Sequence, residues 1–401
     1  MIPVSEAIKI VLAQTKGLPV ESVPLAHATG RVLAQEIIAD SDLPPFDRAQ
    51  MDGYAVRAAD VASTPARLRI VGESAAGAGW HQEMKAGEGV RIMTGAPVPA
   101  GADAVQQVEL TRETDSNSEV EILESLEVGR SIVKRAAEIK SGETVLRGGE
   151  EINVAMIATL ASFGYARVKV GRRPRVAVMA TGSELVDVDQ KPAQDQIRDS
   201  NNFTIAAYAT LAGAIVERLP LAGDNTEELK AEITRAVETS DVLITSGGVS
   251  MGVYDFTKAA LKELGAEMFF ERVALRPGKP TVFARLGKTL IFGLPGNPVS
   301  VAVTFNLFAR TALRSMQGAS QPTLNEETAI LGRSVKGSGD RESYLPAVLR
   351  TDGKGSLIAE PLKWGGSSDF VAFARATALI NVAAGVKSIE AGERVKIVKL
   401  P

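Results

Sequence analysis

Three acidic residues each follow a short apolar run that has the composition of a buried strand. Glu184 comes after VAVMATGS, Asp224 after LPLAG, and Asp255 after VLITSGGVSMGVY. In a parallel α/β sheet the carboxyl ends of the strands meet at one edge, and ligands bind there. Carboxylates gathered at that edge suit a hard cation such as Mg²⁺, held together with the phosphates of a substrate. One acid after a strand is more often a helix cap, so the prediction depends on the three together.

Further groups are expected at the same edge. Asp199 precedes a predicted helix, and the Gly247-Gly248 pair lets a ligand approach the backbone closely. The segment PGNPVS opens another helix, whose free N–H groups attract an anion. Arg276 and Lys279 flank a Pro-Gly turn in LRPGKP, so both charges can face one pocket. Together, these carboxylates, amide donors and cations suit a metal-bridged phosphate and a second anion.

A different kind of segment, PPFDRAQMDGYA at residues 44–55, has neither a helical nor a strand period. Its two prolines fix φ and remove backbone donors, and Asp52-Gly53 is a strong turn signal. The pattern predicts a rigid loop that presents Asp47 and Asp52 for holding a cation or a hydroxyl group. The alternative is that an aspartate before glycine only caps its own turn.

The composition excludes several classes of protein. The chain has no cysteine and two histidines, which excludes thiolate nucleophiles and sulfur-bound metals and disfavours a poly-histidine site. Its net charge of -3 lacks the basic excess of a nucleic-acid-binding protein. The N-terminus has no signal-peptide pattern, and the uncharged run 289–309 contains GLPGNP, which favours a strand, a turn and a helix over a membrane span. We therefore expect a cytoplasmic protein that binds neither nucleic acid nor membranes.

The chain divides into regions that differ in their predicted secondary structure, and these regions would position the candidate residues. Short β-rich pieces occupy about residues 20–145, and GRRPR at 171–175 resembles a linker. After it, buried strands alternate with amphipathic helices, which is typical of a doubly wound parallel sheet. Beyond about residue 320, short strands and glycine-rich turns indicate a small β-barrel. The predicted fold class is α/β plus mostly-β regions, in several domains.

Three local signals fix where elements of the α/β region begin and turn. Asn225 with Glu228 fits a capping box at a helix start. PTVFARLGKTLIFGL predicts a hairpin that turns at Gly287-Lys288. In PGNP, Asn297 can cap the following helix, whose first turn a proline can occupy.

Read together, several long motifs resemble those of a known family. PPFDRAQMDGYA, RIMTGAPVPAGADAVQQVE, ATGSEL, DSNN, TSGGVSMGVYDF, LRPGKPTVFA and GLPGNPVSVAVTF occur in the order seen in molybdopterin molybdenumtransferases, the MoeA family, which includes the C-terminal part of gephyrin. The resemblance covers about residues 1–401. It implies an Mg²⁺-dependent enzyme that takes adenylylated molybdopterin and molybdate, inserts the metal into the dithiolene and releases AMP.

The resemblance also implies an architecture and partners. We expect an elongated homodimer with an N-terminal helical and extended subdomain at 1–45 and 143–172 and a mostly-β subdomain at 46–142. A central molybdopterin-binding α/β domain at 173–320 and a β-barrel at 321–401 complete the plan. The molybdopterin adenylyltransferase and apo-molybdoenzymes are the expected protein partners. Molybdate and tungstate remain open as the oxyanion.

Family roles carry over motif by motif. Glu184, Asp224 and Asp255 match the acidic residues that serve the cation and the nucleotide-pterin. Asp52 and Thr94 resemble positions that face the central-domain cleft of the partner subunit. The remaining matched positions belong to pterin and oxyanion binding: Asp199, Ser200, Gly247, Gly248, Arg276, Lys279, Pro295, Pro298, Ser300, Arg341 and Ser367.

Two other readings stay open. The protein could be a scaffold or carrier that binds the pterin without turning it over. It could also be an adenylyltransferase of the related single-domain type, although that reading leaves the N-terminal region and the barrel without a purpose.

Overall fold

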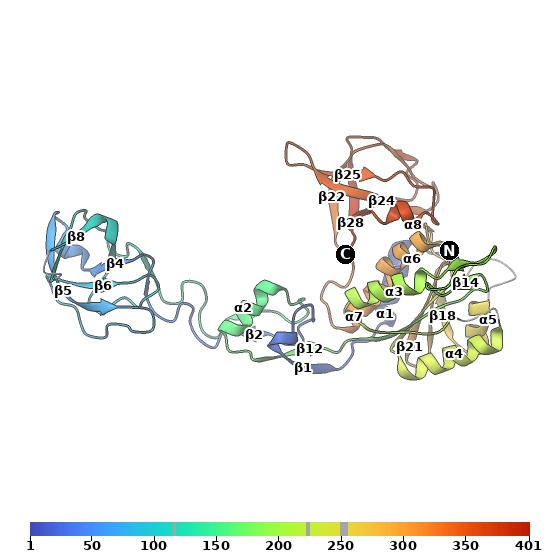
Figure 1. Ribbon diagram of the computed structural model, residues 1–401, viewed down its shortest axis with the longest axis horizontal. Coiled ribbons are helices and arrows are strands. Elements are labelled where there is room, and N and C mark those ends of the chain that lie inside the picture. Colours follow the sequence, from blue (N-terminus) through green and yellow to red (C-terminus); the bar gives the residue numbers. More distant parts are fainter. Residues whose placement is uncertain (115–117, 222–224, 249–255) are drawn as a thin grey trace. The chain divides into compact units, whose positions relative to one another are not determined.

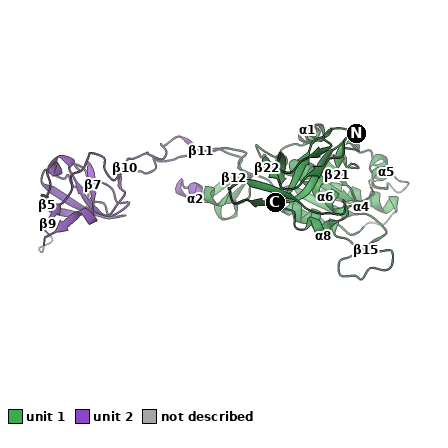
Figure 2. Ribbon diagram, turned by 90° about the horizontal axis from the view of Figure 1, so that it is seen from above, with its two compact units in different colours: residues 1–35, 148–157, 167–401 green, residues 36–147, 158–166 purple. Residues whose placement is uncertain are grey.

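The computed structural model describes residues 1–114, 118–221, 225–248 and 256–401. The chain divides into two compact units (Figure 2). The first unit contains residues 1–35, 148–157 and 167–401, and the second contains residues 36–147 and 158–166. Asp224 and Asp255 lie outside the described residues.

The centre of the first unit is a six-stranded, mostly parallel sheet in the order β16-β13-β17-β21-β20-β18. Strands β16, β13, β17 and β21 are parallel, whereas β20 runs antiparallel to both of its neighbours. The carboxyl ends of β13, β17 and β21 therefore meet at one edge. The strands are β13 (Arg175–Ala180), β16 (Ile215–Arg218), β17 (Val242–Ser246), β18 (Glu267–Phe270), β20 (Val282–Leu286) and β21 (Thr289–Leu294).

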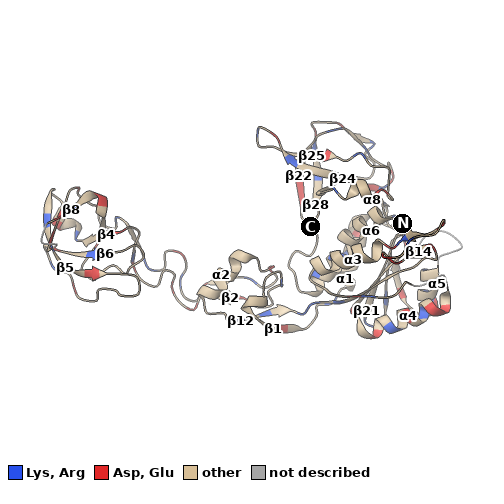
Figure 3. Ribbon diagram, in the orientation of Figure 1, with Lys and Arg blue, Asp and Glu red and all other residues tan. Residues whose placement is uncertain are grey.

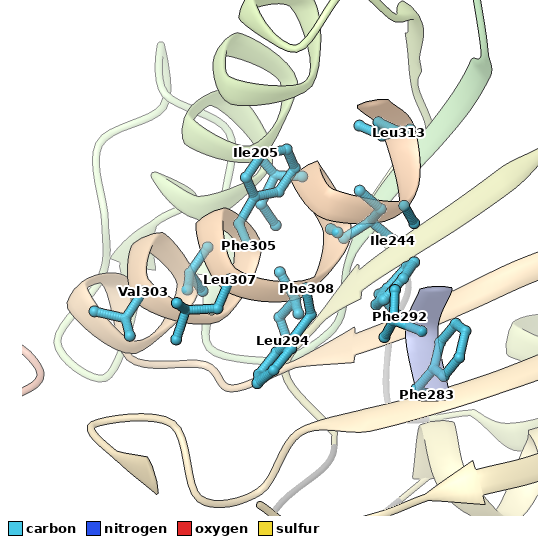
Figure 4. Close-up of a cluster of buried hydrophobic side chains, with 14 of the residues drawn as sticks. Ile205, Ile244, Phe283, Phe292, Leu294, Val303, Phe305, Leu307, Phe308 and Leu313 are labelled. Carbon is cyan, nitrogen blue, oxygen red and sulfur yellow. The ribbon is translucent and has the colours of Figure 1, made fainter. Parts of the chain in front are cut away.

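Helices cover both faces of this sheet (Figure 1). On one face, side chains of α1, α3 and the 298–316 helical stretch pack with the strands into a core that contains Phe283, Phe292 and Phe308 (Figure 4). On the other face, α4 buries Leu229 and α5 buries Leu261. Charged residues recur along α4 (Figure 3), and Glu228 and Arg235 among them are exposed. The helices are α1 (Val4–Gln14), α3 (Asn201–Leu211), α4 (Thr226–Thr239), α5 (Phe256–Glu263), α6 (Pro298–Thr304), the π-helical turn Phe305–Ala309 and α7 (Arg310–Met316).

The predicted helix starts and the hairpin turn are confirmed, but the side chain of Asn297 does not form the predicted cap. The side chain of Asn225 accepts hydrogen bonds from the N–H groups of Glu227 and Glu228 at the start of α4. Strands β20 and β21 form the predicted hairpin, since Leu286 pairs with Thr289 across the Gly287-Lys288 turn. Asn297 occupies the N-cap position of α6, with proline in the first turn, but its side chain makes no cap hydrogen bond.

The C-terminal region closes into a barrel, as predicted. Strands β24, β25, β22, β28 and β26 are joined in order, and the additional pairing of β24 with β26 completes the ring. The short strand β19 (Leu275–Arg276) of the preceding region runs parallel to β24 and adds to it. The barrel strands are β22 (Glu326–Leu331), β24 (Glu342–Thr351), β25 (Leu357–Pro361), β26 (Ala378–Val382) and β28 (Arg394–Lys399), with β23 (Val335–Lys336) and β27 (Ser388–Ile389) pairing separately and α8 (Phe370–Phe373) between β25 and β26.

The second unit is mostly β. Its six-stranded sheet has the order β7-β4-β6-β5-β9-β8 and contains the buried Tyr54 and Ile92. Helix α2 (Val154–Ser162) crosses the boundary between the two units. In the described parts of the chain, no helix has the length and apolar character needed to cross a membrane. The strands of the sheet are β4 (Gly53–Val56), β5 (Ala66–Ser74), β6 (Glu88–Ile92), β7 (Ala104–Gln107), β8 (Thr111–Glu113) and β9 (Glu119–Ile122).

Smaller two-stranded pairs complete the fold. Strand β1 pairs with β12, β2 with β11 and β3 with β10, all antiparallel. Strands β14 and β15 pair in parallel beyond the carboxyl edge of the central sheet. Their bounds are β1 (Val20–Pro24), β2 (Ile37–Ile38), β3 (Arg48–Ala49), β10 (Ile132–Val133), β11 (Thr144–Leu146), β12 (Arg167–Gly171), β14 (Leu185–Val186) and β15 (Ile197–Arg198).

Candidate functional site

A hollow of about 700 Å³, the edge pocket, lies at the carboxyl ends of β13, β17 and β21. Polar residues reach it from the loops after these strands and from the start of α3. Its remaining wall is apolar, which suits a flat ring system that carries polar substituents. The polar residues are Thr181, Glu184, Gln196, Arg198, Asp199, Ser200, Asn201, Ser246, Asn297 and Ser368, and the apolar wall includes Leu185, Val188, Pro192, Ile197, Pro298 and Phe370.

Two glycines shape the end of β17. Gly247 has a φ of 91°, and a Cβ on it would lie 2.4 Å from the carbonyl oxygen of Thr181. Gly248 has a φ of 61°, and a Cβ there would lie 2.4 Å from Oγ1 of Thr257. Both positions therefore require glycine, because a side chain would be strained and would collide with its neighbours. The backbone of Gly247 itself lines the edge pocket.

Asn201 ties three loops of the pocket together. Its Nδ2 donates to Oγ of Ser246 at 2.8 Å and to the carbonyl oxygen of Gly296 at 2.7 Å. Its Oδ1 is buried and has no hydrogen-bond partner among the described residues. Most buried amide oxygens accept a hydrogen bond, so this oxygen is an exception in the wall of the pocket.

The two described carboxylates of the edge pocket have different surroundings. Asp199 is 3% exposed and accepts a hydrogen bond from the N–H of Asn202 at 3.0 Å. Burial raises the pKa of Asp199 despite this bond. Glu184 is exposed and lines the pocket, so its oxygens are open to a ligand. Within the described ranges no three acidic or histidine side chains form a group that could hold a metal ion.

A second hollow of about 770 Å³, the cation pocket, lies between the central region and the barrel. Its lining includes six basic residues and no acidic one. Arg333 pairs with Glu360 at 2.7 Å, and Arg341 lies 3.5 Å from Asp340. The other four basic residues form no ion pair with any residue that the structure describes. The pocket therefore has an excess of positive charge, which suits an anion. The six are Arg276, Lys279, Arg333, Lys336, Arg341 and Lys363.

The loop Pro295–Asn297 separates the two pockets, because Asn297 lines both. Nδ2 of Asn297 donates to Oγ of Ser367 at 2.8 Å, and the N–H of Val299 donates to the carbonyl oxygen of Ser367 at 3.0 Å. These bonds fix the segment between β25 and α8 against the start of α6. Two ligands bound in the two pockets would therefore lie on opposite sides of one loop.

The second unit brings Asp52 and Thr94 together. Oδ1 of Asp52 accepts hydrogen bonds from the backbone N–H of Thr94 at 2.6 Å and from its hydroxyl at 2.7 Å. Both donors lower the pKa of the Asp52 carboxyl. Asp47, the other aspartate of this loop, instead pairs with Lys134 at 2.8 Å and accepts from the N–H of Arg135. Asp47 is therefore engaged in holding its loop, while Asp52 is exposed.

The structure groups the described candidate residues into three places. Gly248 borders the edge pocket without lining it, and Asp52 and Thr94 form their own pair in the second unit. Glu184, Asp199, Ser200, Gly247 and Pro298 line the edge pocket, whereas Arg276, Lys279, Pro295, Ser300, Arg341 and Ser367 line the cation pocket.

Sequence reasoning missed several residues of both pockets. Asn201 was only the start of a predicted helix, and Phe370 had no periodic signal. Arg333, Lys363 and Trp364 enter the cation pocket from the segments that follow β22 and β25, and Lys336 enters it from β23. A scan for basic residues next to glycine-rich turns could have found Lys363, which precedes WGGSSDF.

The class of protein follows from the match of these parts to known families. Residues 177–315, which contain the central sheet and the edge pocket, match the model described as a probable molybdopterin binding domain. Residues 2–164 match the MoeA N-terminal region (domains I and II), and residues 328–400 match the MoeA C-terminal region (domain IV). The fold and both pockets thus belong to a multidomain protein built around a molybdopterin-binding domain.

Full-length relatives identify the particular family. The chain is 35% identical to the molybdopterin molybdenumtransferase of Bacillus subtilis (strain 168) over 99% of its length and 93% of the relative. It is also 35% identical to the molybdopterin molybdenumtransferase of Staphylococcus aureus (strain COL), over 99% of its length and 95% of the relative. Two solved MoeA structures from Pyrococcus horikoshii superpose with TM-scores of 0.80 and 0.85 at 32% and 27% identity, over 100% of this chain and 99% and 100% of theirs. The chain belongs to the MoeA family, whose members act in molybdenum cofactor biosynthesis.

Proposed function

We propose that the protein is a molybdopterin molybdenumtransferase that inserts molybdate into adenylylated molybdopterin and releases AMP. The observation that carries this proposal is the pair of adjoining pockets on either side of Asn297. One has an apolar wall with polar groups for a flat heterocycle, and the other has only basic charges for an oxyanion. Joining a metal oxyanion to a pterin requires both ligands within reach of each other.

The edge pocket would bind the adenylylated pterin. Glu184, together with Asp224 and Asp255, would hold Mg²⁺, and the hard oxygen donors present suit that ion. When bound, Mg²⁺ would withdraw charge from the pyrophosphate link to AMP. Phe370, at 52% exposure, offers a face on which the heterocycle can stack.

The cation pocket would bind molybdate, a dianion. Arg276, Lys279 and Arg341 supply charge, and the hydroxyls of Ser300 and Ser367 supply neutral donors. Since tungstate has nearly the same size and charge, the pocket would accept it as well. Fixed cations around the oxyanion would keep it beside the pterin while the metal is transferred.

Asp52 and Thr94 would complete the site in a homodimer. Their hydrogen-bonded pair holds an ionised carboxylate on an exposed, proline-rich loop. We propose that this loop reaches the edge pocket of a second copy of the chain. A cytoplasmic homodimer that receives its pterin from the adenylyltransferase and passes its product to apo-molybdoenzymes fits this role.

A single-turnover assay tests the proposal. The purified protein is mixed with adenylylated molybdopterin and Mg²⁺, with and without molybdate, and AMP release and reconstitution of an apo-molybdoenzyme are followed. We expect molybdate to trigger both signals. Pterin binding with neither signal would instead identify a scaffold or carrier. Formation of adenylylated molybdopterin from ATP would identify an adenylyltransferase.

A further inference from the structure

A third hollow lies at the opposite end of the central sheet from the two substrate pockets. It has a volume of about 600 Å³, and we call it the arginine pocket. Arg175 and Ile215, which line it, are the first residues of β13 and β16, whereas the edge pocket begins beyond Ala180, the last residue of β13. The length of β13, roughly 16 Å at about 3.3 Å per residue, therefore separates the two sites.

The arginine pocket carries more positive charge than its neighbours neutralise. Four arginines and His27 line it, against the single acid Glu21. Glu21 pairs with Arg31, and Asp241, which lies next to the pocket, pairs with Arg172 at 2.7 Å. The other two, Arg173 and Arg175, form no ion pair with any residue that the structure describes. An excess of two positive charges in one hollow favours a dianion.

Several hydrogen bonds fix the segment that supplies three of these arginines. The N–H of Arg172 donates to the carbonyl oxygen of Pro19 at 2.9 Å, and the N–H of Ile215 donates to that of Pro174 at 2.8 Å. The N–H of Arg175 donates to Oδ2 of Asp241 at 2.7 Å. These bonds fix the backbone of the GRRPR segment. The side chains of its three arginines therefore start from fixed positions.

Arg31 forms the floor of the pocket. It is 5% exposed, and its Nη2 donates to the carbonyl oxygen of Gly171 at 2.8 Å and to Glu21. Its Nε is also buried and has no hydrogen-bond partner among the described residues. A buried guanidinium is costly in an apolar setting, and an anion in the adjoining hollow would lower that cost through its opposite charge.

We propose that the arginine pocket binds a phosphate-class dianion, at a site separate from the substrate pockets. Arginine is suited to this ligand because its planar fork of N–H groups matches phosphate oxygens in pairs. Arg173 and Arg175 bind the phosphate oxygens, and Arg31 and Arg172, already held in place, supply the positive floor. Val23, Ala26 and Ile215 leave apolar surface for an organic group attached to the phosphate.

Isothermal titration of the full-length protein with inorganic phosphate and with AMP tests the proposal and separates a free phosphate from one carried by a nucleotide. The test variant is Arg173→Gln/Arg175→Gln. Arg112→Gln/Arg235→Gln, which removes two exposed arginines, one in the six-stranded sheet of the second unit and one on α4, controls for the loss of two positive charges. Lys279→Gln identifies any binding that belongs to the cation pocket.

We expect at least one of the two ligands to bind about tenfold more weakly to Arg173→Gln/Arg175→Gln, since hydrogen bonds to charged groups are lost. Binding by Arg112→Gln/Arg235→Gln and the melting temperature of Arg173→Gln/Arg175→Gln should stay close to those of the wild type. The proposal is overturned if neither ligand loses affinity in Arg173→Gln/Arg175→Gln, or if Arg112→Gln/Arg235→Gln or Lys279→Gln accounts for the whole loss.

Discussion

Asp52 and Thr94 lie 42 residues apart in the chain, yet one carboxylate oxygen accepts both donors of the threonine. These bonds lower the pKa of Asp52, so the carboxylate is ionised at neutral pH. Because the folded-state pKa is below the unfolded value of about 3.9, their contribution to stability is present above that value and is lost as the pH falls through the folded pKa.

Replacing the hydroxyl donor should raise the pKa of Asp52. In Thr94→Val the backbone N–H bond remains, so we expect a partial return toward the ordinary aspartate pKa. NMR titration of the side-chain carboxyl measures this value, with Thr210→Val, whose hydroxyl bonds within α3, as a control. An unchanged Asp52 pKa in Thr94→Val would show that the hydroxyl bond does not form in solution.

Phe370 should control the affinity for the pterin and leave the oxyanion site intact. Its side chain lines the edge pocket, while its neighbour Val371 is 71% exposed and lines neither substrate pocket. Since stacking on an aromatic ring contributes about 1 kcal/mol, Phe370→Ala should weaken pterin binding about fivefold. Val371→Ala is the matched control, and binding is measured by titration with the adenylylated pterin.

The molybdate dependence of AMP release should be the same in Phe370→Ala and in wild type once the pterin is saturating. Unchanged pterin affinity in Phe370→Ala would show that the pterin does not stack on Phe370. It would not contradict the transferase proposal, because turnover by the wild-type protein tests that proposal separately.

At the scale of elements, the end of β17 depends on glycine for two separable reasons. Gly247 has a positive φ and a close backbone neighbour, whereas Gly265 at the end of α5 has a φ of 75° and open space around its Cβ position. Gly265→Ala should therefore lower the free energy of unfolding by only the left-handed backbone cost, about 1–2 kcal/mol. Gly247→Ala adds a collision with the carbonyl of Thr181 and should lower it further.

Urea unfolding of both glycine variants measures this difference, and pterin binding reports the effect on the edge pocket. We expect Gly247→Ala to lose pterin affinity and Gly265→Ala to keep it. Equal stability losses in the two variants would mean that the turn after β17 relaxes to accommodate a side chain.

At the scale of the whole molecule, a shared active site predicts complementation between subunits. If Asp52 of one subunit serves the Glu184 pocket of the other, Asp52→Ala and Glu184→Ala should each be folded and nearly inactive. A mixed dimer contains one site with both groups and one with neither. Random mixing should then restore about a quarter of wild-type cofactor formation, since half of the dimers are mixed and each has one intact site.

The comparison requires each variant alone, the mixture after subunit exchange, and the double variant Asp52→Ala/Glu184→Ala mixed with either single variant. The mixtures containing the double variant should stay inactive, because none of their dimers can assemble a site with both groups. If the mixture of the two single variants is no more active than either variant alone, both residues of a site come from one subunit.

Local chemistry in the sequence determined much of the fold. Breakers and periodicity predicted the hairpin at Gly287-Lys288, the start of α4 at Asn225 and the return to β structure after residue 320, because turns and caps depend on a few adjacent residues. The parallel sheet also followed from alternation along the chain, and its carboxyl edge brings Glu184 and Gly247 to one pocket as the strand ends predicted.

Other features depend on contacts between distant segments, which no local pattern contains. Asn297 has the sequence of a helix cap, but its amide instead donates to Ser367, 70 residues away, and so joins the two substrate pockets. In the sequence, Asp47 is as good a candidate for ligand binding as Asp52, but in the structure Lys134 donates a hydrogen bond to the carboxylate of Asp47. The sequence by itself determined the elements and the edge at which chemistry could occur. The tertiary structure decided which charged groups are neutralised by partners and which remain available to a ligand, because pairing depends on distance in space.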